Sequence, residues 1–174
     1  MYNKKDKKIY EKTSKYLKKI NANDINNKLE QIDKILQIKD IKERYSYLYD
    51  LLCDYLDNEF KEKNICGFSN NICKRCLDLK NRNIQKDSYF NGCCHRFLDG
   101  SNCKQLDLNT GRCKVRNLSC KLFTCNYLKK KGYKFSLKDI YLSRYFFNLR
   151  QRYYLDSAFF LSKEELLKEI LKRG

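Results

Sequence analysis

The hydrophobic positions of this chain recur at helical intervals near both ends and lose that pattern in the middle. Near the start, one set is Ile25, Leu29, Ile32 and Leu36, and the next is Ile41, Tyr45, Leu48, Leu52 and Tyr55. Each set falls on one face of a helix, because residues three or four apart lie on the same side. We therefore predict two or three packed helices within residues 1–62. Asn23 or Asp24 is expected to cap the first set, and Asp40 the second.

Residues 129–174 show the helical pattern again. Ser136 with Asp139, and Ser162 with Glu165, have the spacing of a capping box, which predicts two helix starts. The apolar positions that follow them are Leu142, Tyr145, Phe146, Leu149 and Tyr153 in the first helix, and Leu166, Leu167, Ile170 and Leu171 in the second. The aromatic residues here are most simply explained as core: Tyr145, Phe146, Phe147, Tyr153, Tyr154, Phe159 and Phe160. A base-stacking platform would need the same side chains exposed.

Residues 63–128 have almost no apolar periodicity but hold nine of the ten cysteines. Asn109-Thr110-Gly111 lies between two short segments and indicates a turn. A hairpin at this point would bring Cys103 and Cys113 near each other. A segment with so little core needs another source of stability, and a structural zinc supplies on the order of 10 kcal/mol in small peptides.

These patterns predict a mainly α protein, a helical bundle with an inserted small irregular or β-hairpin cysteine-rich metal module. The length of 174 residues favours a single domain. Its expected parts are a helical part (residues 1–62), the cysteine-rich metal-binding module (63–128) and C-terminal helices (129–174).

The expected cellular compartment decides how the cysteines are interpreted. The basic N-terminal stretch lacks the roughly 7–15-residue apolar segment of a signal peptide, and no run of about 18 apolar residues predicts a membrane span. We therefore expect a cytoplasmic location, where thiols stay reduced and metal ligation is favoured over disulfides. The candidate ligands are Cys66, Cys73, Cys76, Cys93, Cys94, Cys103, Cys113, Cys120 and Cys125.

Clustered thiolates are soft ligands, which select zinc or an iron–sulfur cluster over calcium or magnesium. Each of these cofactors takes four cysteines. Nine candidates therefore suit two sites, or one site together with cysteines that bind no metal. Spacing alone does not separate zinc from iron, and either Cys120 or Cys125 could belong to the core instead.

Two residues are less favoured as ligands. Cys53 lies in a helical stretch and is most simply a buried apolar filler. His95 follows Cys94 directly, and adjacent side chains rarely point the same way, so a Cys-His nucleophile pair is not expected. The sequence contains no phosphate loop, paired-carboxylate motif or catalytic triad. Enzymatic activity is not excluded, and its expected catalytic group would be an iron–sulfur cluster with an open coordination position.

The charge balance is strongly basic, with 38 Lys and Arg against 21 Asp and Glu, for a net charge of +17. Such a charge attracts polyanions. Besides a metal ion, nucleic acid or another acidic macromolecule is therefore an expected partner. A basic nucleic-acid-binding protein with a structural zinc site is the alternative function. The simpler explanation of the charge is a solvated, lysine-coated surface.

The segment "CCHRFLDGSNCKQLDLNTGRCKVRNLSCKLFTC" resembles the YkgJ-like cysteine-cluster proteins, a zinc- or iron-chelating domain. The double cysteine, "NCKQLD", "GRCKV" and "RNLSCKLFTC" match the family's pattern in order, with both prolines of the last piece replaced. The family's compact CxxCxxCC is stretched here, because sixteen residues separate Cys76 from Cys93. The resemblance covers about residues 66 to 128. It implies chelation by Cys76, Cys93, Cys94, Cys103, Cys113 and Cys120, with Cys73 and Cys125 as further candidates.

Overall fold

The computed structural model describes residues 2–63, 68–69, 72–73, 103–107, 112–125, 128–129 and 132–174. The chain divides into two compact units. The bundle unit comprises Met1–Leu52 and Ser136–Gly174, and the cysteine unit comprises Cys53–Phe135. The described residues are mainly helical, which confirms the predicted fold class at this level.

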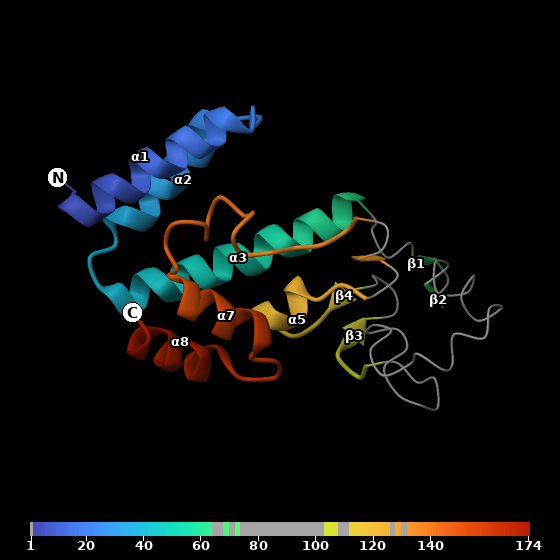
Figure 1. Ribbon diagram of the computed structural model, residues 1–174. Coiled ribbons are helices and arrows are strands. Elements are labelled where there is room, and N and C mark those ends of the chain that lie inside the picture. Colours follow the sequence, from blue (N-terminus) through green and yellow to red (C-terminus); the bar gives the residue numbers. More distant parts are fainter. Residues whose placement is uncertain are drawn as a thin grey trace. The chain divides into compact units, whose positions relative to one another are not determined.

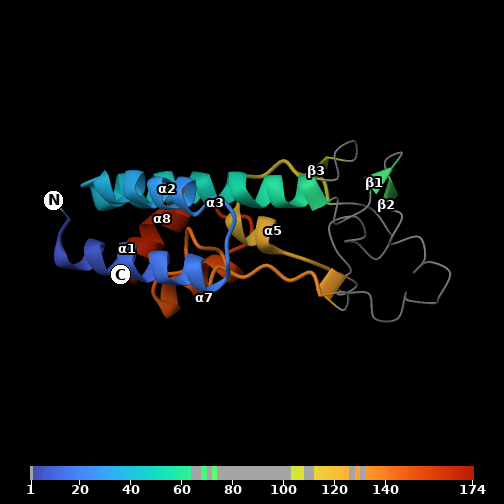
Figure 2. The same ribbon diagram turned by 90° about the horizontal axis from the view of Figure 1, so that it is seen from above.

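The bundle unit is built from helices at both ends of the chain (Figure 1). They are α1 (Lys4–Lys19), α2 (Ile25–Gln37), the first part of α3 (Ile41–Lys63), α7 (Leu149–Ser157) and α8 (Lys163–Lys172). α1 and α2 pack as an antiparallel pair, which both views show (Figures 1 and 2). α7 packs against α8.

The predicted apolar faces of α2 and α3 form much of the bundle core. The buried members of these faces are Ile32, Leu36, Tyr45, Leu48 and Leu52, whereas Ile41 is exposed. The Asp40 carboxylate accepts a hydrogen bond from the Glu43 N–H at 2.7 Å, which confirms the predicted cap of α3. Asp24 does occupy the N-cap position of α2, but its side chain makes no capping bond. Its backbone is left-handed (φ 52°), whereas a capping residue typically has an extended backbone.

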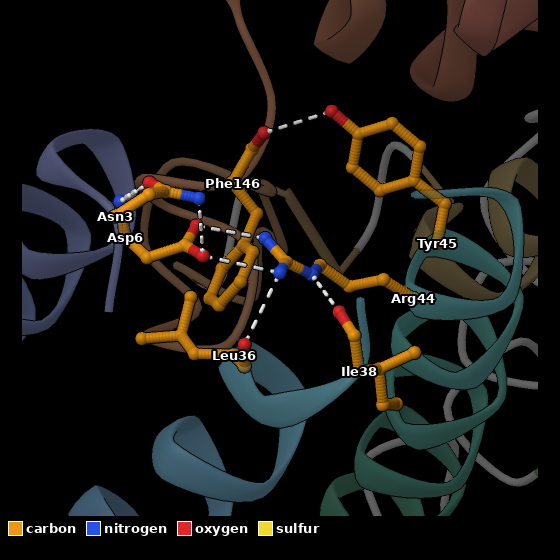
Figure 3. Close-up of polar contacts among 7 residues, drawn as sticks. All are labelled: Asn3, Asp6, Leu36, Ile38, Arg44, Tyr45 and Phe146. Atoms are coloured by element: carbon orange, nitrogen blue, oxygen red, sulfur yellow. Dashed lines mark hydrogen bonds and ion pairs between the residues drawn. The ribbon is translucent and has the colours of Figure 1, made fainter. Parts of the chain in front are cut away.

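A buried ion pair ties α1 to the α2–α3 connection (Figure 3). The Arg44 guanidinium donates to both carboxylate oxygens of Asp6, at 2.8 and 3.1 Å. It also donates to the carbonyls of Leu36 and Ile38, at 3.1 and 2.8 Å. The Asn3 amide donates to the same Asp6 carboxylate at 2.9 Å. Arg44 therefore joins all three N-terminal helices through one side chain.

The two predicted capping boxes near the C-terminus had different outcomes. Ser162 and Glu165 form the box that was predicted, and α8 follows it with Leu166, Leu167 and Ile170 buried. The helix predicted from Ser136 is wrong, because residues 137–146 form turns and α7 begins only after Asn148. Ser143 accounts for part of this difference. Its buried hydroxyl donates to the Leu137 carbonyl at 2.6 Å, and such local bonds compete with the helical ladder.

The aromatic residues of this region are only partly core. Phe146 and Phe147 are buried, and the Phe147 ring stacks on Tyr45 with centroids 5.4 Å apart. The core prediction is wrong for Phe159, for Phe160 (53% exposed) and for Tyr153 (76% exposed). On α7 the buried side chains are Leu155 and the polar Gln151, whereas the aromatic Tyr153 faces outward.

The cysteine unit contains the end of α3 and short elements. β1 (Phe68–Ser69) pairs antiparallel with β2 (Ile72–Cys73), and β3 (Leu106–Asp107) pairs antiparallel with β4 (Arg112–Cys113), before α5 (Leu118–Leu122). The β3–β4 pair lies where the sequence predicts a hairpin, with Leu106 opposite Cys113, whereas the predicted turn at 109–111 lies outside the described residues. A small apolar cluster is formed by Cys125, Leu128, Phe60, Tyr133 and Phe135.

Candidate metal centre

The thiols of Cys113 and Cys120 are hydrogen-bonded to each other. Cys113 ends β4, and Cys120 lies in the first turn of α5. The position of Cys120 follows from the cap of α5, because the Asn117 side chain accepts a hydrogen bond from the Cys120 N–H at 3.0 Å. A strand end and a helix start thus bring together two of the predicted ligands.

The surroundings of Cys113 favour its thiolate. The pKa of Cys113 is lowered to about 6, first by the hydrogen bond from Cys120, and further by the Val115 backbone N–H and the positive charge of Lys121. Burial and the Asp57 carboxylate act in the opposite direction without cancelling this effect. The thiolate is the form of cysteine that binds metals and reacts as a nucleophile. The lowered pKa of Cys113 therefore favours its reactive, ligand-competent form at neutral pH.

Two ion pairs hold the segment around Cys120 against α3. The Lys121 side chain is only 3% exposed, and its ammonium contacts both oxygens of Asp57 at 2.6 and 2.7 Å. One turn earlier on α3, the Asp54 carboxylate accepts from the Arg116 guanidinium at 2.8 Å. The buried Lys121 therefore anchors this segment to α3 next to Cys120, and the more exposed Arg116–Asp54 pair adds a weaker contact on the other side of Cys120.

The other candidate ligands have different surroundings. The Cys103 carbonyl accepts from the N–H of Leu106, the residue opposite Cys113, so the hairpin holds the Cys103 backbone close to that position. Cys125 is buried in the apolar cluster of the cysteine unit. Cys53 is fully buried, as predicted.

The remaining predicted ligands are less fully described. Cys73 lies on β2 opposite Phe68, and only its backbone is described. Cys66, Cys76, Cys93, Cys94 and His95 lie outside the described residues. Within the part of the chain that the structure describes, no three His, Cys, Asp or Glu side chains form a group that could hold a metal. The ligand set predicted from the sequence therefore stays a prediction.

Several residues that shape this site were missed by the sequence analysis. Four residues outside the predicted ligand set position the thiol pair or alter the charge around it: Asn117, Lys121, Asp54 and Asp57. One usable signal was present, because Asp54 and Asp57 lie one helical turn apart in a strongly basic chain. Acidic residues on one helix face, in such a chain, indicate a docking position for basic side chains.

Comparisons with known proteins add no family. No family model matches the sequence, and neither a curated protein nor a solved structure matches it. The resemblance to the YkgJ-like cysteine-cluster proteins therefore stays a prediction. Among the described helices, none is both long enough and apolar enough to cross a membrane.

The lowered pKa predicts a distinct pH dependence for Cys113. In metal-free, reduced protein, the rate of Cys113 alkylation by iodoacetamide should rise with pH, with a midpoint near pH 6. An ordinary cysteine thiol, with a pKa of 9.0, would give a midpoint near pH 9. The Cys120→Ala variant should move that midpoint upward, because it removes the strongest cause of the shift. Peptide-resolved mass spectrometry between about pH 5 and pH 9 measures both curves. A wild-type midpoint at the ordinary value would contradict the assigned geometry.

The same shift has a consequence for stability, with a defined sign. The folded-state pKa of Cys113 is lower than the unfolded one, so the thiolate stabilises the folded state. This contribution is complete above the ordinary pKa of 9.0 and is lost as the pH falls toward the folded value of about 6.

Proposed function

We propose that this chain is a metal-binding cysteine-cluster protein, which ligates zinc or an iron–sulfur cluster through thiolates that include Cys113 and Cys120. The observation that carries the proposal is the hydrogen-bonded thiol pair with its lowered pKa. A metal must displace the thiol proton to bind, so a low pKa reduces the proton's competition at neutral pH. Two sulfur ligands already in contact also reduce the conformational cost of forming the site.

A four-thiolate site needs two further ligands. Cys103 is the first choice, because the hairpin places its backbone next to the residue opposite Cys113. The remaining candidates are Cys66, Cys73, Cys76, Cys93 and Cys94. Cys125 is the weakest candidate, because the side chains packed against it and Leu128 are apolar or aromatic.

The polar neighbours of the thiol pair fit a charged metal–thiolate group. Each bound thiolate adds negative charge, and a partly buried site such as that of Cys113 and Cys120 holds this charge best with compensation. The Lys121 ammonium lies close enough to lower the pKa of Cys113, and the Val115 N–H points a donor at the same sulfur. Hydrogen bonds and charges around the sulfurs tune such centres whichever metal is bound.

The test is the metal content and visible spectrum of the reduced protein, purified without oxygen. We expect the wild type to carry zinc, or iron with sulfide and a broad visible band. Cys113→Ser and Cys120→Ser should each lose metal from this site. Cys53→Ala is the matched control, because it removes a thiol that is fully buried on α3 and should keep the wild-type content. Wild-type protein without metal, or serine variants with undiminished content, would refute the proposal.

A further inference from the structure

The exposed side of α1 carries a concentrated positive charge. The helix contains Asp6 and Glu11 as its acidic residues and the following eight lysines: Lys4, Lys5, Lys7, Lys8, Lys12, Lys15, Lys18 and Lys19. All eight lysines are exposed, whereas Asp6 is buried and paired with Arg44 (Figure 3). At about 100° per residue, the lysines cover an arc of about 160° opposite the buried positions. Glu11 is therefore the single acidic residue of α1 on that side.

This charge is a property of α1 and not only of a lysine-rich composition. α2 and α8 each contain as many acidic as basic residues. Lysines of these helices pair with carboxylates, as Lys34 does with Glu30 and Lys172 with Glu169. Across the described residues, no α1 lysine lies within ion-pair distance of a carboxylate. Among the described residues, Glu11 is therefore the one α1 carboxylate on this face, against eight lysines without an ion pair.

We propose that the exposed face of α1 binds the sugar–phosphate backbone of a nucleic acid. The helix is about 24 Å long, which matches about seven phosphates along one strand of a B-form duplex. Lysines that neutralise phosphates release condensed counterions, and this release supplies most of the free energy of non-specific binding. Lysine is a flexible point charge, so this face reads the backbone and not the base sequence.

A nucleic acid fits this face better than an anionic membrane surface does. A helix that lies in a membrane interface buries an apolar face among the lipids. The apolar residues of α1, Ile9 and Leu17, are instead buried within the protein. The exposed apolar residue at this helix is Ile20, at its C-terminal cap. The exposed face of α1 therefore carries charge but no apolar surface that could insert into a membrane.

The experiment compares two triple variants that remove the same charge from the full-length protein. One is Lys4→Gln, Lys8→Gln and Lys15→Gln, which lie on the line of α1 opposite its buried residues. The control is Lys104→Gln, Lys134→Gln and Lys168→Gln, which are exposed residues on other segments. Glutamine and lysine have similar helix propensities, so α1 should stay folded, as circular dichroism can verify. Fluorescence anisotropy then measures binding to a labelled 24-base-pair DNA duplex and to RNA of the same length, between 50 and 200 mM KCl.

We expect the α1 variant to bind at least about tenfold more weakly at low salt, with a salt slope smaller by up to about three. The control variant should retain nearly the wild-type affinity and slope. Equal losses in both variants would overturn the proposal in favour of net charge alone. Wild-type protein that fails to bind either nucleic acid at 50 mM KCl would also overturn it. So would binding to vesicles of phosphatidylserine and phosphatidylcholine without binding to nucleic acid.

Discussion

Replacing Asp6 by alanine should lower the free energy of unfolding by about 3–5 kcal/mol. The substitution leaves the Arg44 guanidinium buried without its carboxylate, and only the Leu36 and Ile38 carbonyls remain as acceptors. Removing one partner of a buried pair is costly, because the other charge stays desolvated. The whole stability of a domain is about 5–15 kcal/mol, so this loss would be a large fraction of it. Urea unfolding followed by far-ultraviolet circular dichroism measures the change.

Two further variants test whether the loss of stability comes from the buried Asp6–Arg44 ion pair or from removing any charged residue. Lys34→Ala removes an exposed ion pair, in which Lys34 and Glu30 are 59% and 63% exposed, and should cost less than about 1 kcal/mol. The double variant Asp6→Leu with Arg44→Met should recover much of the loss, because an apolar pair of similar size leaves no charge buried. If Asp6→Ala costs no more than Lys34→Ala, the pair is not what joins the N-terminal helices.

The apolar faces of α2 and α3 were predictable because burial of a helix face imposes a regular spacing. Ile32, Leu36, Leu48 and Leu52 follow that spacing and are buried. Asp6 carries no such signal, since an acidic residue among lysines usually lies on a solvated face. Its burial depends on Arg44, which is 38 residues away in the sequence.

The two similar capping motifs show where local patterns fail. Ser162 precedes a segment whose buried residues, Leu166, Leu167 and Ile170, fit one helix face. Ser136 precedes four consecutive buried residues, 140–143, and a single helix face does not bury four residues in succession. Here tertiary packing overrides a capping motif that would otherwise start a helix.

The cysteines of the candidate site could be predicted from the sequence, but the ion pairs that hold them in place could not. Cysteine clustering pointed to the thiols of Cys113 and Cys120, and the Asn-Thr-Gly pattern predicted a hairpin in the region where β3 pairs with β4. The ion pairs that hold residues 116–121 against α3 join residues 62 and 64 positions apart. Such long-range pairs leave no periodic trace in the sequence, so the positions of Arg116 and Lys121 could not be derived from it.

Removing the metal should destabilise the hairpin of the cysteine unit, so that it opens more often, and leave the bundle unit folded. β3 and β4 contain two residues each, and so short a strand pair is not stable in water by itself. If Cys113 binds the metal, the binding free energy, on the order of 10 kcal/mol for a structural zinc, becomes folding free energy of this segment. The Leu106 N–H and Lys114 N–H, which donate to the Cys103 and Gln105 carbonyls, should then exchange rapidly in chelator-treated protein.

Amide hydrogen exchange of peptides from residues 103–116 and 41–52, before and after chelation, tests this expectation. The first peptide should lose its protection and regain it when zinc or iron with sulfide is restored, while the second, in the α3 part of the bundle unit, should not change. Equal protection of residues 103–116 in both states would mean that the metal does not stabilise the hairpin. Contacts other than the metal, among them the Arg116–Asp54 ion pair, would then order residues 103–116. A loss of protection in both peptides would instead mean that the two units unfold together, and that the bundle core depends on the metal as well.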